Sequence, residues 1–384
     1  MGNTFPAWFS GRATLAWSEV TVREQREEFV RLASQAEANV SEICRRYGIS
    51  RKTGYKWLSR EQFDDRSRRP LSSPARTPAE LEAQVIAVRS RHPAWGGRKI
   101  AHVLARDEGV QLAASTITSV LRRHGLISQT ASEAPMAWQR FEHDRPNALW
   151  QIDFKGHFPT DTVRCHPLTV LDDHSRFNVV LEALGNEQRQ GVQGALQGAF
   201  ERYGLPERIN ADNGPPWGTG GTGVVSALGV WLIRLGVRLS HSRPAHPQTN
   251  GKDERFHRTM VAEVLAHRRF RDLEDAQRQL HQWRHVYNFE RPHQALGMHT
   301  PASRYAASTR SMPSKLAPIE YGPDDQVRRV QDGGWISFRG QDFRLCKALA
   351  GEPVALRPRA DRDGAFDVYF CHHKVDSIGM DLAH

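Results

Sequence analysis

Three acidic residues in three separate settings constrain most strongly what this chain can fold into. Asp153 and Asp212 lie within or at the end of short apolar runs that predict strands, and Glu254 lies in the first turn of a helix entered through Asn250. A fold that brings two strands and one helix together can aim all three carboxylates at one point. Three hard oxygen ligands in one place indicate Mg²⁺ or Mn²⁺.

The order of the elements around these acids indicates the fold of the central region. Three strand-like runs are followed by a helix, a fourth strand, a second helix and a short fifth strand. The expected strands are 150–154, 168–177, 178–183, 207–212 and 237–241, and the expected helices are 191–203 and 224–235. With acids on the first and fourth strands and on a later helix, this order predicts an RNase H-like α/β core, a mixed five-stranded sheet flanked by helices.

The first part of the chain predicts DNA-binding helices. Residues 1–145 carry 23 Lys and Arg against 16 Asp and Glu, which is seven of the ten net positive charges. Helices at 23–36, 41–48 and 50–59, with Ser50 as an N-cap, have the spacing of a helix-turn-helix. On its last helix, the residues expected to contact phosphates and base edges are Arg51, Lys52, Thr53 and Lys56. The alternative is a basic three-helix bundle that binds protein.

A second helical unit follows a linker rich in proline, serine and arginine. Thr77-Pro-Ala-Glu80 resembles a capping box, and helices are expected near 81–91, 95–107 and 114–124. Ser115, Thr116 and Thr118 are candidate contacts to the DNA backbone. A dimerisation or spacer bundle fits this unit equally well.

The last part of the chain predicts a small β-barrel. Short alternating runs lie between 327 and 380, separated by turns that contain glycine. Such a domain would contact DNA or another protomer, or would serve only as a structural cap. Adjacent residues on a strand point to opposite faces, so Cys371, His372 and His373 are not expected to bind a metal together.

Length and composition set the remaining limits. At 384 residues the chain allows several domains, and its net charge of +10 favours a polyanionic partner. We expect no membrane span, a location in the bacterial cytoplasm in association with the nucleoid, and four reduced cysteines without a zinc ribbon. The expected segments are a helix-turn-helix domain (20–62), a linker (63–76), a second helical domain (77–126), a linker (127–145), the catalytic core (146–310) and a small β-domain (325–384).

Longer motifs carry a resemblance to a known family. They are Leu149-Trp-Gln-Ile-Asp-Phe154, Asp172-Asp-His-Ser-Arg176, Ala211-Asp-Asn-Gly214, His246-Pro-Gln-Thr-Asn-Gly-Lys252, Glu254-Arg-Phe-His257 and Tyr287-Asn-Phe-Glu-Arg-Pro-His293. In this order they closely resemble bacterial insertion-sequence transposases of the DDE type, whose core is similar to retroviral integrase. The resemblance implies that Asp153, Asp212 and Glu254 are the catalytic, metal-binding triad.

The resemblance also implies the chemistry. Two Mg²⁺ ions, for which Mn²⁺ can substitute, would serve 3′-end cleavage by water and then strand transfer into target DNA by the freed 3′-OH. The expected partners are the terminal repeats of the element, the target DNA and further copies of the chain. The 41 residues between Asp212 and Glu254 exceed the usual spacing, so an insertion is expected to loop out near 218–223.

Other residues near the acids are open to two interpretations. Lys252 and Arg258 are candidate contacts to DNA phosphate, and the alternative is that both are solvated. His246 and Asn250 are candidates for positioning the scissile strand, or are turn-forming residues. Asp253 points about 100° away from Glu254 on a helix, so only one of them can face the site. Asp172 and Asp173 are expected to be solvated turn residues.

Two rival functions differ from transposition. A catalytically inactive, DNA-binding regulator derived from a transposase would keep the helix-turn-helix units and show no aligned acid triad. An RNase H-like nuclease without strand transfer would have little use for helices that read a sequence. The three acid settings and the two N-terminal units therefore favour the transposase.

Overall fold

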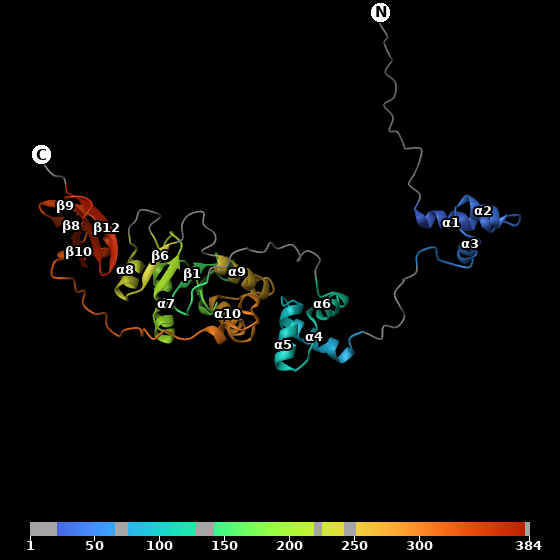
Figure 1. Cartoon of the computed structure of the whole chain (residues 1–384), viewed down its shortest axis with the longest axis horizontal. Helices are drawn as coiled ribbons and strands as arrows, with labels where there is room; N and C mark the ends of the chain where they lie inside the picture. The colour runs from blue at the N-terminus through green and yellow to red at the C-terminus, as the bar shows by residue number, and fades with distance from the viewer. Residues whose placement is uncertain (1–20, 66–75, 128–141, 219–224, 242–250, 381–384) are drawn as a thin grey trace, which may run out of the picture. The chain divides into compact units, whose positions relative to one another are not determined.

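The computed structural model describes residues 21–65, 76–127, 142–218, 225–241 and 251–380. The chain divides into two compact units, residues 1–76 and 77–384. Figure 1 colours them from blue helices near the N-terminus to red strands near the C-terminus. No helix in the described ranges is both long and apolar enough to cross a membrane.

The first unit contains the three expected helices, which are α1 (Val22–Ala33), α2 (Val40–Arg46) and α3 (Arg51–Leu58). Ser50 is the N-cap of α3, and its hydroxyl accepts a hydrogen bond from the Thr53 amide at 3.1 Å. Phe29, Cys44 and Trp57 form the buried centre of the bundle. The three-helix prediction for this unit is confirmed.

The second unit begins with α4 (Ala79–Arg91), α5 (Gly97–Asp107) and α6 (Ala114–Arg123). The expected capping box is wrong: the N-cap of α4 is Pro78, which has no hydroxyl, and no side chain caps this helix. Thr118 donates its hydroxyl to the Ala114 carbonyl at 2.7 Å, so its hydroxyl proton is used within α6. Lys99 of this bundle lies 3.7 Å from Glu263 of the following core.

A mixed sheet forms the core, and its central strand carries Asp153. The strands are β1 (Trp150–Phe154), β2 (Phe158–Pro159), β3 (Arg164–Asp172), β4 (Asn178–Leu184), β5 (Arg208–Ala211) and β6 (Arg238–His241). The path is β2-β3-β1-β5-β6, with β4 also paired to β3. β1 runs antiparallel to β3 and parallel to β5. The five expected strands are present, and the two-residue β2 is an addition.

Helices cover both faces of this sheet. On one face, α7 (Arg189–Tyr203) and α8 (Ala227–Arg234) pack against Trp150 and Ile152 of β1. On the other, α9 (Gly251–Met260) and α10 (Leu273–His285) pack against Leu171 and Leu181 of β3 and β4. Because side chains alternate along a strand, Gln151 and Asp153 point to the face that α9 covers. α9 and α10 run on into the π-helical turns η3 (Val261–Leu265) and η4 (Val286–Glu290), and the 3₁₀ turns η5 (Gln294–Leu296) and η6 (Pro301–Arg304) follow.

The C-terminal strands form two separate sheets. One is a four-stranded antiparallel sheet made of β7 (Gln326–Arg329), β10 (Pro353–Pro358), β11 (Ala365–Phe370) and β12 (His373–Gly379). The other is a hairpin in which β8 (Trp335–Phe338) pairs with β9 (Gln341–Arg344). The 3₁₀ turn η7 (Lys347–Leu349) precedes β10. Within the described part of the chain, no strand pairing closes them into the expected barrel. The sheets pack on Val230 and Ile233 of α8.

Candidate active site

β1 and β5 bring Asp153 and Asp212 to the same end of the sheet. The two strands run parallel with Trp150 level with Ile209 and Gln151 level with Asn210. Continuing this register, Asp153 and Asp212 are level with each other, although 212 follows the last residue of β5. Asp212 is exposed, and its Oδ1 accepts a hydrogen bond from the Gly214 amide at 3.0 Å. The strands therefore place the first two predicted ligands together.

Among the described residues, Lys155 is the cation that lowers the pKa of Asp153, and its effect is smaller than that of burial. The pKa of Asp153 is raised to about 6, mainly by burial; a hydrogen bond from the Phe154 amide lowers it, the negative charges of Asp212 and Glu187 raise it, and Lys155 has a smaller lowering effect. Like charges at short range destabilise each other unless a cation lies between them. The pair thus fits a hard divalent cation by its oxygen donors and by its charge.

His257 adds an unprotonated nitrogen to this arrangement. The Thr169 hydroxyl donates to the Asp153 carbonyl at 3.0 Å, so it accepts the hydrogen bond from His257 Nε2 at 2.8 Å. Burial lowers the pKa of His257 to about 4, so the ring is neutral and its Nδ1 is an acceptor. Nδ1 lies 4.0 Å from Asp153 Oδ2. Two acceptors that face each other leave a place for a cation or a water molecule.

The described residues do not form a three-ligand metal site that includes Glu254 of α9. Glu254 is exposed, whereas its neighbour Asp253 is 1% exposed. Burial and then the charges of Asp153 and Asp173 raise the pKa of Asp253 well above its ordinary value. No three acidic, histidine or cysteine side chains of the described residues lie close enough together to hold one metal ion. Asp153 and Asp212 are thus level on neighbouring strands, and Glu254 is exposed on α9.

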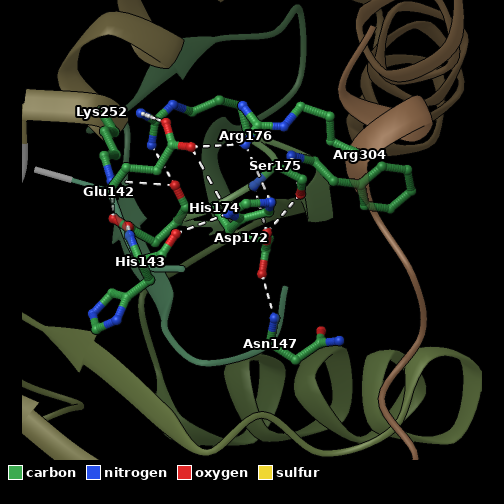
Figure 2. Close-up of polar contacts among 11 residues, drawn as sticks. Glu142, His143, Asn147, Asp172, His174, Ser175, Arg176, Lys252 and Arg304 are labelled. Carbon is green, nitrogen blue, oxygen red and sulfur yellow. Dashed lines mark hydrogen bonds and ion pairs between the residues drawn. The ribbon is translucent and has the colours of Figure 1, made fainter. Parts of the chain in front are cut away.

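The turn after β3 is a buried polar cluster, so the expectation of solvated Asp172 and Asp173 is wrong (Figure 2). Asp172 accepts hydrogen bonds from the Ser175 amide at 2.8 Å, from the Ser175 hydroxyl at 2.5 Å and from the Asn147 amide at 2.7 Å. These three donors compensate for its burial. Arg176 adopts a left-handed backbone with φ 64°, which turns the chain back into β4.

Lys252 belongs to this cluster. Its ammonium forms an ion pair with Asp173 and donates to the Asp173 carbonyl at 3.2 Å, and its side chain is only 16% exposed. Arg258, on the same helix, is exposed. His246 and Asn250 lie outside the described residues. Nothing in the sequence of α9 alone indicates that Lys252 has an acidic partner 79 residues away.

The N-terminal unit presents a basic helix surface. Arg51, Lys52 and Lys56 are exposed on α3, and Thr53 is partly exposed. Trp57 is buried, with the Arg26 guanidinium 4.1 Å from its ring centroid. Stacking of this kind anchors the helix and leaves its N-terminal cations to solvent.

Family models match four parts of the chain. An integrase core domain model matches residues 143–247, and a second one matches 235–301. The C-terminal domain of IS481 family transposases matches 325–383, and a homeodomain-like domain matches 40–121. Together these matches follow the helical N-terminal region, the core and the C-terminal strands.

Two curated relatives are insertion-element proteins. An uncharacterized 31.7 kDa protein of insertion element IS407 from Burkholderia multivorans is 27% identical over 290 residues, which cover 73% of this chain and 95% of the relative. An uncharacterized 39.2 kDa protein of IS476 from Xanthomonas euvesicatoria is 26% identical, covering 84% of this chain and 88% of the relative.

Solved structures with a similar chain include two of viral origin. One is the intasome of simian T-cell lymphotropic virus in complex with a PP2A regulatory subunit, at a TM-score of 0.38 and 15% identity over 78% of this chain and 97% of that one. The other is the HTLV-2 integrase catalytic core domain in complex with magnesium, at a TM-score of 0.30 and 16% identity over 42% of this chain and 96% of that one.

Proposed function

We propose that this chain belongs with the insertion-element transposases that carry an integrase core. On this premise, it cleaves the 3′ ends of its element and joins them to target DNA. The observation that carries the proposal is the level placement of Asp153 and Asp212 on parallel strands. Both acids lie at one end of the mixed sheet, which is covered by helices on both faces.

Glu254 is the proposed third ligand. Around α9 it lies about 60° from His257, the residue whose ring faces Asp153, and about 100° from Asp253. It therefore occupies the flank of the helix beside the imidazole.

Mg²⁺ is the proposed cofactor, with Mn²⁺ as a substitute. Two such ions would supply activation of the attacking oxygen and stabilisation of the leaving one. Asp153, Asp212 and Glu254 would hold them, and the neutral His257 ring would keep one side of Asp153 free of competing donors. The C-terminal strands and the second helical bundle have no proposed chemical role.

DNA binding is proposed for the first unit. Arg51, Lys52, Thr53 and Lys56 of α3 would contact phosphates and base edges of the element ends. Arg258 would contact phosphate near the site, and His246 and Asn250 would position the scissile strand. Lys252 would need to leave Asp173 to reach phosphate. Several copies of the chain are expected on the DNA, because two element ends must be joined.

The test is a strand-transfer assay with the purified chain, Mg²⁺ and labelled DNA that carries the ends flanking this gene. Wild type should cleave and join the ends, whereas Asp153→Asn and Glu254→Gln should bind the same DNA and do neither. Asp253→Asn is the matched control on α9 and should retain both steps. A wild type that binds the ends without metal-dependent cleavage would indicate the inactive regulator instead.

A further inference from the structure

A buried ion pair ties the first turn of α9 to the core. Lys252 lies two residues before Glu254, and its ammonium contacts both a carboxylate oxygen and the backbone carbonyl of Asp173. Asp173 is 1% exposed and the Lys252 side chain is 16% exposed. The contact therefore lies in the interior and not among solvated surface charges, where ion pairs contribute little.

Asp173 is itself held rigidly from other elements. Its Oδ1 accepts a hydrogen bond from Gln151 Nε2 at 2.7 Å, and its Oδ2 accepts one from the His143 amide at 2.9 Å. Its own amide donates to the Leu149 carbonyl at 2.9 Å. Gln151 and Asp153 share one face of β1, so the acceptor of Lys252 is connected to the strand that carries the first catalytic acid.

A second contact ties α9 one and a half turns further on. His257 donates to Thr169, which in turn donates to the Asp153 carbonyl. Lys252 and His257 are five residues apart, which is about 7.5 Å along the helix. Two anchors at that separation fix both the position and the rotation of the turn that contains Glu254. The Lys252 anchor adds a polar restraint on the first turn to the packing of the buried Asp253 and Phe256 side chains.

We propose that Lys252 is a positioning residue: its ion pair with Asp173 sets the rotation of α9, so that Glu254 can join Asp153 and Asp212 around the metal ions. The inference rests on the proposed function and assigns to Lys252 a role other than contact with DNA phosphate. Such supporting residues commonly change metal affinity by roughly 10- to 100-fold when they are replaced.

The test compares metal binding with DNA binding in the full-length chain. Mn²⁺ affinity is measured by electron paramagnetic resonance on the free protein, and end-DNA affinity is measured across a series of salt concentrations without metal. Lys252→Met should weaken Mn²⁺ binding by roughly 10-fold or more. It should leave the salt dependence of DNA binding unchanged. Arg258→Met is the matched control on the same helix and should reduce the salt slope by about one while retaining Mn²⁺ affinity.

Asp173→Asn tests the same ion pair from its other end. It should weaken Mn²⁺ binding as Lys252→Met does, and the double variant should bind Mn²⁺ no worse than either single variant. Thermal melting shows which variants are folded. If only one of the two single variants folds, its Mn²⁺ affinity is compared with that of wild type. A Lys252→Met protein with wild-type Mn²⁺ affinity, tighter Mn²⁺ binding or a reduced salt slope would overturn the inference.

Glu254→Gln separates this inference from the proposed function. If Glu254→Gln loses Mn²⁺ affinity and Lys252→Met does not, only the positioning role is wrong. If Glu254→Gln binds Mn²⁺ as well as wild type does, Glu254 is not a ligand, and both the proposed triad and the role of Lys252 are wrong.

Discussion

Replacing Asp253 by asparagine should stabilise the metal-free protein, although the side chain is fully buried. Asp253 is 1% exposed, and its Oδ1 has no hydrogen-bond partner among the described residues. Asp153 and Asp173 add negative charge nearby, and the cations Lys252 and Arg176 offset only part of it. The amide keeps the shape of the side chain and removes its charge.

The magnitude follows from the cost of an unpaired buried group. A buried acceptor without a partner costs about 1–3 kcal/mol, and a charged one costs more. Asparagine keeps the unpaired Oδ1, so the expected gain comes from removing the charge. We therefore expect the free energy of unfolding to rise by about 1–3 kcal/mol in Asp253→Asn at mildly alkaline pH. For a region of 150–250 residues, each kcal/mol raises the melting temperature by about 2–4 °C.

The raised pKa of Asp253 determines how the stability difference between the variant and wild type changes with pH. Burial raises the pKa of Asp253 above its ordinary value of 3.8, so the folded protein binds this proton more tightly than the unfolded chain does. Stability linked to this group is therefore present at low pH and is lost as the pH rises through the folded pKa. Asparagine does not titrate, so the advantage of the variant should be absent near pH 4 and should grow as the pH rises.

The assay is thermal unfolding in EDTA at several pH values, followed by tryptophan fluorescence. Glu254→Gln is the control, because it removes the neighbouring exposed carboxylate and should change stability by less than about 0.5 kcal/mol. The reasoning is refuted if Asp253→Asn is less stable than wild type at alkaline pH. It is equally refuted if the gain is the same at acidic and alkaline pH.

Three further predictions concern the site and the first unit. Because the pKa of Asp153 is raised to about 6, protons should compete with Mn²⁺ below that pH: the half-saturating Mn²⁺ concentration, measured by electron paramagnetic resonance, should fall as the pH rises to about 6 and change little above it. Gly54→Ala should destabilise the first unit by about 1–3 kcal/mol in a melting experiment, because the new Cβ would lie 2.5 Å from Cys44 Sγ. Lys52→Met should weaken binding to all DNA sequences and reduce the salt slope by about one, whereas an unchanged slope would argue for a protein partner.

The order of the core elements is readable from the sequence because local patterns determine them. The apolar alternation around Asp153 predicts β1 with its observed bounds, and Ser50 caps α3 as expected. The capping box at Thr77 failed because α4 begins one residue after Pro78, which places the threonine outside the N-cap position. A one-residue shift of a helix end is enough to remove such a contact.

The buried turn after β3 shows where local patterns are insufficient. An aspartate at a strand end is commonly solvated, and Asp172 is buried because Asn147 and Ser175 supply three donors to it. Those donors come from different places in the chain, and their convergence depends on the whole sheet. Similarly, the C-terminal runs predict strands correctly, but which strands pair, and so whether a barrel closes, depends on contacts between distant segments.

The third ligand is the hardest part of the site to derive, because it depends on the rotation of one helix. Asp253 lies about 40° from His257 around α9, and Glu254 lies about 60° from it on the other side. The burial of His257 alone therefore does not decide which acid faces inward. In the structure Asp253 is the buried acid and Glu254 is exposed, and the restraint that we propose for Glu254 is the ion pair of Lys252 with Asp173, which lies 79 residues earlier in the chain. A change at Asp173 should therefore alter the position of Glu254 without touching any of the three acids.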